Sequence, residues 1–244
     1  MRWWDRRARR RAGVARLTPS QWVGLAAFAA LAVIVAVGVG PPPDRSAGVP
    51  QERVAQARAA LAEIGVLAAR PPHAADYDRA AFGADWTDAS DAPGGGNGCD
   101  TRNDVLARDL EVTGHVAIAS CPRAVAAGIL TSPYTGRRIV FERGRGSSAV
   151  QIDHVVPLSY AWDLGARGWT RARRTRFAND PANLVAVDGP SNLDKSDAEP
   201  ARWMPPLAGF ACQYAVQFVL VLRSYGLPID APSRAVVVAA LADC

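Results

Sequence analysis

The sequence lacks the motifs of a zinc-stabilised domain and of a domain that recognises specific base sequences. Its four cysteines include no CxxC pair, so we expect neither a structural zinc site nor a zinc finger. Aromatic residues make up only 7% of the chain and form no array on which bases could stack. Apolar residues make up 49%, which excludes a wholly disordered chain.

Most of the net positive charge lies at the N-terminus. Residues 1–20 contain seven Arg and one Asp, which gives them a net charge of +6, whereas the whole chain carries +5. Residues 21–98 contribute −3 and residues 99–244 contribute +2. The charge of the C-terminal part therefore gives no argument for DNA binding.

Charged residues are absent from positions 22–40. Nineteen uncharged residues can just span a bilayer as a helix. The arginines of residues 1–20 would hold that flank in the cytoplasm, so residues 21–40 are expected to be a single-pass anchor with the rest of the chain outside. The alternative is a cleaved signal peptide and a secreted protein. Both interpretations export the C-terminal part.

No cysteine occurs before Cys99, and an even number in an exported domain indicates disulfides. Four cysteines allow three pairings. We favour Cys99–Cys121 and Cys212–Cys244, because each closes a short loop between neighbouring elements; four buried free thiols are the alternative.

Residues 41–98 are predicted to be a linker that contains one amphipathic helix at 51–69 and a Gly/Pro-rich loop that ends before residue 99. Residues 99–244 are predicted to be an α+β domain. The expected strands are 112–119, 138–142, 149–156 and 184–187, and the expected helices are 101–110, 158–177, 191 onward, 209–224 and 232–242.

Three segments carry the chemistry: IDHVVPL at 152–158, NDPANLVAV at 179–187 and SNLDKSD at 191–197. They resemble the HNH (ββα-metal) endonucleases, in particular the exported branch with a D-H-[IV]-V-P motif, and the HNH domain of CRISPR-Cas9 nucleases shows a similar order of motifs. The resemblance covers residues 149–200, and a looser likeness to exported actinobacterial HNH proteins extends it across 99–244. It implies a ββα-metal core inside a mostly helical domain.

The resemblance also implies roles for individual residues. His154 would be the general base, Asp153 and Asn192 would hold a divalent metal, and Asn183 would brace the loop and orient His154. Oxygen-only ligands suit Mg²⁺, with Mn²⁺ possible. No organic cofactor is expected. Consecutive strand residues point to opposite faces, so the strand must end or bend near Pro157 for Asp153 and His154 to serve one site.

Four cationic residues are candidates for binding phosphate. Lys195 lies three residues after Asn192, and Arg102 is suggested by the family likeness. Arg171 and Arg174 would share one face of a helix, where they could follow a nucleic-acid backbone. A solvated helix face explains the same arginines.

The sequence therefore predicts an exported, metal-dependent endonuclease that acts on DNA, with RNA as the alternative substrate. Its sequence specificity is expected to be low, because contacts to the backbone alone carry no sequence information. The alternatives are a non-catalytic nucleic-acid or envelope-binding module on an HNH scaffold, and a hydrolase of other phosphate esters.

Overall fold

The computed structural model describes residues 48–119, 121–144 and 146–244, which lie in one compact unit. The predicted basic flank, the predicted membrane or signal segment and the first residues of the predicted linker lie outside this part. No helix in the described ranges combines the length and hydrophobicity needed to cross a bilayer.

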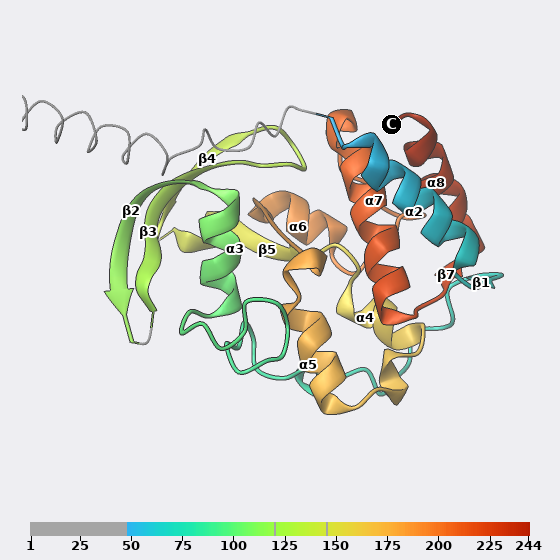
Figure 1. Cartoon of the computed structure of the whole chain (residues 1–244), viewed down its shortest axis with the longest axis horizontal. Helices are drawn as coiled ribbons and strands as arrows, with labels where there is room; N and C mark the ends of the chain where they lie inside the picture. Colours follow the sequence, from blue (N-terminus) through green and yellow to red (C-terminus); the bar gives the residue numbers. More distant parts are fainter. Residues whose placement is uncertain (1–47, 120, 145) are drawn as a thin grey trace, which may run out of the picture. The chain divides into compact units, whose positions relative to one another are not determined.

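The described residues form the α+β fold that the sequence predicts (Figure 1). The helices are α2 (Gln51–Glu63), α3 (Thr101–Asp109), α4 (Leu158–Asp163), α5 (Arg171–Asn179), α6 (Gly189–Lys195), α7 (Ala208–Tyr225) and α8 (Ala231–Ala242). The strands are β1 (Val66–Leu67), β2 (Glu111–Ile118), β3 (Cys121–Thr131), β4 (Arg138–Glu142), β5 (Val150–His154), β6 (Leu184–Asp188) and β7 (Ile229–Asp230). Short 3₁₀ turns include η1 (Arg79–Phe82) and η2 (Ser147–Ala149).

Three small sheets organise these strands. β2, β3 and β4 form an antiparallel sheet in that order, β5 and β6 form an antiparallel hairpin, and β1 pairs with β7 in parallel. Figure 1 shows the three-stranded sheet at one end, the helices α2, α7 and α8 at the other, and β5 with α6 between them. The hairpin therefore lies at the centre of the described unit.

The β5–β6 hairpin separates two hydrophobic clusters. Val150 and Ile152 belong to the cluster formed with α3, β3 and β4, whereas Val185 and Val187 belong to the cluster formed with α2, α4, α7 and α8. Alternation along each strand thus places successive side chains in different clusters. A strand covered on both faces is apolar throughout, which explains the run LVAV at 184–187.

The helix predicted at 158–177 is instead two helices. α4 ends at Asp163, and Gly165 then adopts a φ of +128°, a conformation that L residues rarely adopt. Thr170 caps α5 by accepting a hydrogen bond from the Arg173 backbone N–H. The interruption turns the chain before it returns to the hairpin.

The linker assignment also needs refinement, because α2 is part of the core. Val54, Ala57 and Leu61 are buried in the cluster that contains α7. The helix is shorter than predicted, since it ends at Glu63, but its apolar face follows the predicted spacing.

Both predicted disulfides are present. Cys99 pairs with Cys121 across a Cα–Cα distance of 4.5 Å, and Cys212 pairs with Cys244 across 5.5 Å. The first joins the loop before α3 to the start of β3, and the second joins α7 to the end of the chain. No cysteine is free.

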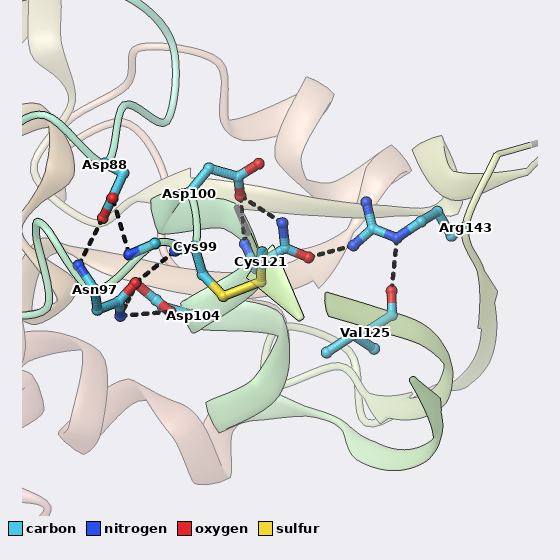
Figure 2. The surroundings of a disulfide bond; sticks show 10 residues. Asp88, Asn97, Cys99, Asp100, Asp104, Cys121, Val125 and Arg143 are labelled. Atoms are coloured by element: carbon cyan, nitrogen blue, oxygen red, sulfur yellow. Dashed lines mark hydrogen bonds between the residues drawn. A yellow bond between two sulfur atoms is a disulfide. The ribbon is translucent and has the colours of Figure 1, made fainter. Parts of the chain in front are cut away.

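Hydrogen bonds order the surroundings of the Cys99–Cys121 disulfide (Figure 2). The Asp88 carboxylate accepts from the backbone N–H groups of Asn97 and Gly98 at 3.1 and 3.0 Å. Arg143 donates to the Val125 carbonyl at 2.8 Å and to the Asn103 side chain. The loop, α3 and the three-stranded sheet are thereby joined at one point.

We expect the Cys212–Cys244 disulfide to stabilise the fold substantially. Replacing both residues by Ala removes a cross-link between positions 32 apart and should lower the free energy of unfolding by about 2–5 kcal/mol. Urea denaturation of the double variant beside the parent protein measures the change. A loss below about 1 kcal/mol would show that the packing of α7 on α8 suffices without the cross-link.

Candidate active site

The three predicted segments form the β5–β6 hairpin and the helix that follows it. Asp153 pairs with Val185, and His154 pairs with Leu184, in the antiparallel register. β5 remains a strand through His154. The bend that would bring Asp153 and His154 to one side is therefore absent, and their side chains lie on opposite faces of the hairpin.

On one face, the Asp153 carboxylate is enclosed by a lysine and a tyrosine. Lys195 Nζ donates to Asp153 Oδ1 at 3.0 Å and to the His154 carbonyl oxygen at 2.9 Å. The Tyr134 hydroxyl donates to Asp153 Oδ2. Lys195 and Tyr134 are fully buried, and Asp153 is 5% exposed. Burial raises the pKa of Asp153, while Lys195 and Tyr134 act to lower it.

Asn192 lies on the same face of the hairpin as Asp153. It is half-buried on α6, and its Nδ2 donates to Gln151 Oε1 at 2.8 Å. α6 begins here because the Asp188 carboxylate caps it by accepting from the Ser191 backbone N–H at 3.0 Å. The helix thus starts two residues earlier than predicted and carries both Asn192 and Lys195 over β5.

This arrangement does not fit a divalent cation between Asp153 and Asn192. Both Asp153 oxygens already accept hydrogen bonds, one of them from an ammonium group. Within residues 48–244 as described, no group of three or more His, Cys, Asp or Glu side chains is placed to hold a metal. A cation could reach the Asp153 carboxylate only if Lys195 Nζ left it.

On the other face, His154 has the environment of a neutral base. Its Nε2 lies 2.9 Å from the Ala178 carbonyl oxygen. A carbonyl oxygen only accepts, so Nε2 carries the proton and Nδ1 has the free lone pair. Burial is the main cause that lowers the pKa of His154 to about 3. The imidazole is therefore neutral at neutral pH.

The His154 ring lines a small pocket. Trp86 stacks on it with ring centroids 5.5 Å apart and planes 12° apart. The pocket has a volume of about 10 Å³, which is close to what one water molecule needs. Its polar lining comes from Arg79, Asp85, Asn179 and His154. A water molecule in this pocket would lie beside a neutral imidazole.

Asn183 holds the chain just after His154. Its Oδ1 accepts from the Val156 backbone N–H at 2.8 Å, and its Nδ2 donates to the Val156 carbonyl at 3.1 Å. Asn183 is fully buried. It contacts the loop backbone as the resemblance implies, but the hydrogen bond that orients the imidazole comes from Ala178.

The candidate phosphate-binding residues differ in their availability. Arg102 donates to the carbonyl oxygens of Ser147 and Val150, and burial lowers its pKa. Arg174 donates to the carbonyls of Ala81 and Trp169 and lies over the Trp162 ring. Lys195 is engaged with Asp153. These three side chains bind protein groups in this structure. Arg171 is exposed on α5, so it remains available to a ligand.

The sequence analysis missed three residues of this region: Arg79, Trp86 and Tyr134. Arg79 and Trp86 line the His154 pocket, and Tyr134 contacts Asp153. All three precede the motif in the chain and lie in no segment with a recognised pattern. The pocket lining reveals Arg79, the ring stacking reveals Trp86, and the buried hydroxyl contact reveals Tyr134.

A family model matches the part of the chain that contains β5, β6 and α6. Residues 100–230, more than half of the chain, match the family model described as GmrSD restriction endonucleases, C-terminal domain. The chain belongs to this family. A relative from Arthroderma benhamiae, described as an uncharacterized secreted protein, is 38% identical over 151 residues, which cover 60% of this chain and 68% of the relative. No solved structure matches the chain. The family match includes β5, β6 and α6 but begins after Trp86.

Proposed function

We propose that this chain is an exported endonuclease of the HNH type that hydrolyses phosphodiester bonds of nucleic acid, most readily DNA, with low sequence specificity. Membership of a restriction-endonuclease family supports the activity. β5, β6 and α6 follow one another as in a ββα core, except that α4 and α5 are inserted between the two strands. The observation that carries the proposal is geometric: the His154 ring, with Nε2 bound to the Ala178 carbonyl, lines a pocket that fits one water molecule.

In the proposed reaction, His154 Nδ1 accepts a proton from a water molecule as the water oxygen attacks the phosphorus. The bond from phosphorus to the leaving sugar oxygen breaks, and solvent supplies the proton that this oxygen takes up. The hydrogen bond from Nε2 to the Ala178 carbonyl stabilises the imidazolium that forms. Asn183 fixes the backbone on which His154 is carried.

The HNH resemblance implies a divalent cation, most often Mg²⁺ and alternatively Mn²⁺, with Asp153 and Asn192 as its ligands; the side chains as they lie do not fit it, so it belongs to the proposal only for a conformation in which Lys195 has left Asp153. There the ion would supply positive charge to a phosphate bound on that face of the hairpin. Because Lys195 Nζ holds the Asp153 carboxylate at 3.0 Å, an ion would have to displace it. None of the steps above passes through the ion.

A metal series on supercoiled plasmid tests this proposal. We expect the purified protein to nick the plasmid in Mg²⁺ or Mn²⁺, and we expect EDTA to abolish nicking until excess Mg²⁺ is added. An RNA substrate assayed under the same conditions shows whether the protein prefers DNA or RNA. Undiminished cleavage in EDTA would show that no divalent cation is required and would rule out the metal part of this proposal.

Two observations support an extracellular location. Both disulfides belong to the described domain, and such cross-links persist in oxidising compartments. The relative from Arthroderma benhamiae is described as secreted. Attachment to a membrane through residues 21–40, or release after their cleavage, remains part of the proposal.

One observation favours the non-catalytic alternative, a nucleic-acid or envelope-binding module. The Asp153 carboxylate and the His154 ring lie on opposite faces of the hairpin, so they do not meet at one phosphate. A gel-shift assay run beside the plasmid assay separates the two functions. DNA retention without nicking in every metal would favour the module.

A further inference from the structure

The pocket beside His154 is completed by a segment that belongs to no recognised motif. Residues 79–86 supply more than half of its lining, and the rest comes from His154, Leu158 and the end of α5. This segment lies before residue 100, where the family match begins. More than half of the lining of the His154 pocket therefore comes from outside β5, β6 and α6.

Trp86 is held over His154 in a strained backbone conformation. Its φ is +55°, which is uncommon for a residue with a side chain and costs about 1–3 kcal/mol, so it persists only where the surroundings impose it. The surroundings do so here, because the Trp86 carbonyl accepts from the Thr101 N–H at 3.2 Å. The Cys99–Cys121 disulfide fixes the chain two residues before Thr101. The ring is thus fixed as one wall of the pocket.

Arg79 provides a cation at the same pocket. Its side chain is 54% exposed, and its ion pair with Asp85 is long, at 3.6 Å between Nε and Oδ1. Arg79 also donates a hydrogen bond to the hydroxyl of the half-buried Tyr77. Arg79 is close enough to His154 to influence the imidazole electrostatically. In contrast to Arg102, Arg174 and Lys195, it is not committed to a buried protein group.

The volume of the pocket limits which groups can enter it. At about 10 Å³ it admits a water molecule but not a phosphate group. A phosphate must therefore lie at the mouth, where Arg79 is accessible. A guanidinium offers two parallel N–H donors to phosphate oxygens and binds them more strongly than a single exposed carboxylate at 3.6 Å.

We propose that Arg79 binds a phosphate group of the substrate at the mouth of the His154 pocket, displacing Asp85, while Trp86 holds the imidazole toward the bound water. This inference deepens the proposed function and rests on it. It assigns substrate positioning to the segment 79–86, and not to Arg102, Arg174 or Lys195.

The first test measures binding without catalysis. The chain contains three histidines, so the ring resonances of His154 can be identified by NMR from single variants at His73 and His115. Titration with inorganic phosphate should shift the His154 resonances in the parent protein but not in Arg79→Ala. Absence of a shift in the parent, or an equal shift in Arg79→Ala, would overturn the assignment.

The matched control is Arg138→Ala. Arg138 is 63% exposed and forms a similarly loose ion pair with Glu111, at 3.8 Å, but it lies on β4 and does not line the pocket. Arg138→Ala should keep the phosphate-dependent shift of His154. A general effect of removing one surface charge would appear equally in both variants and would contradict the proposal.

The second test measures turnover on plasmid or oligonucleotide DNA. Arg79→Ala should lower kcat/KM by about 10- to 100-fold, the usual weight of a hydrogen bond to a charged group, mainly through KM. Arg79→Lys should recover part of the loss, and Arg138→Ala should stay within about twofold of the parent. If the parent cleaves no nucleic acid while the phosphate shift still depends on Arg79, the proposed function fails and the phosphate site stands. Equal turnover in Arg79→Ala and Arg138→Ala would overturn the site alone.

Discussion

Replacing His154 by Ala should lower the rate of plasmid nicking by about two to four orders of magnitude, the usual contribution of a general base. The reason is that one atom, His154 Nδ1, accepts the proton in the proposed reaction. Nε2 is bound to the Ala178 carbonyl, and in the described ranges no hydrogen bond to Nδ1 is present. Nδ1 is thus the atom that can accept a proton from water, and Ala offers no substitute.

His154 is buried, and Trp86 stacks on it, so Ala also leaves a cavity. His154→Gln separates folding from chemistry, because its amide can still donate to the Ala178 carbonyl but cannot act as a base at neutral pH. We expect Gln to retain most of the thermal stability and to show the same loss of nicking as Ala. The loss in both variants should appear in kcat.

The controls are the other two histidines. His73 is about half exposed, where it contacts Asp163, and His115 lies on β2, whose residues do not line the pocket. Replacing either by Gln should leave nicking within about twofold of the parent. If His154→Gln folds and cleaves within tenfold of the parent, the imidazole is not the base.

Much of the fold follows from local patterns in the sequence. The apolar spacing that predicts α2, α7 and α8 is visible within a few turns, and the run at 184–187 predicts β6. β3 escaped prediction because Pro122, Gly128 and several Ala are poor strand formers. It forms because β2 and β4 lie on either side of it, which is a tertiary cause.

The candidate site was predictable only in part, for a related reason. The motif residues lie close in sequence, so they indicate a hairpin with a helix across it. Arg79 and Trp86 lie about 70 residues before His154, and nothing in their local sequence indicates that they meet it. β5 does end close to Pro157, at His154, but this does not bring Asp153 and His154 to one side, because the register fixes which face each side chain occupies.

Lys195 illustrates a third limit. Its position three residues after Asn192 suggested contact with phosphate, but a lysine can be buried when it has a charged partner. The partner here is Asp153, which is separated from it by 42 residues and is found only in the folded chain. The Lys195 side chain is 0% exposed, so it cannot contact a ligand directly in this conformation.

Lys195→Met should therefore destabilise the protein strongly. It leaves the Asp153 carboxylate buried with only the Tyr134 hydroxyl as a side-chain donor, and breaking a buried ion pair costs about 3–5 kcal/mol. For a domain of this size, that corresponds to a fall in Tm of roughly 6–20 °C. Differential scanning calorimetry or urea denaturation measures the change.

The double variant Lys195→Met, Asp153→Asn is the decisive control. It removes both charges, so the cost of an unpaired buried charge disappears, and we expect it to recover most of the lost stability. Arg138→Ala, which breaks an exposed ion pair, should change stability by less than about 1 kcal/mol. If Lys195→Met costs no more than that exposed control, the ammonium is not held by Asp153 in solution. Lys195 would then be free to contact phosphate, and the Asp153 carboxylate would be open to a metal ion beside Asn192.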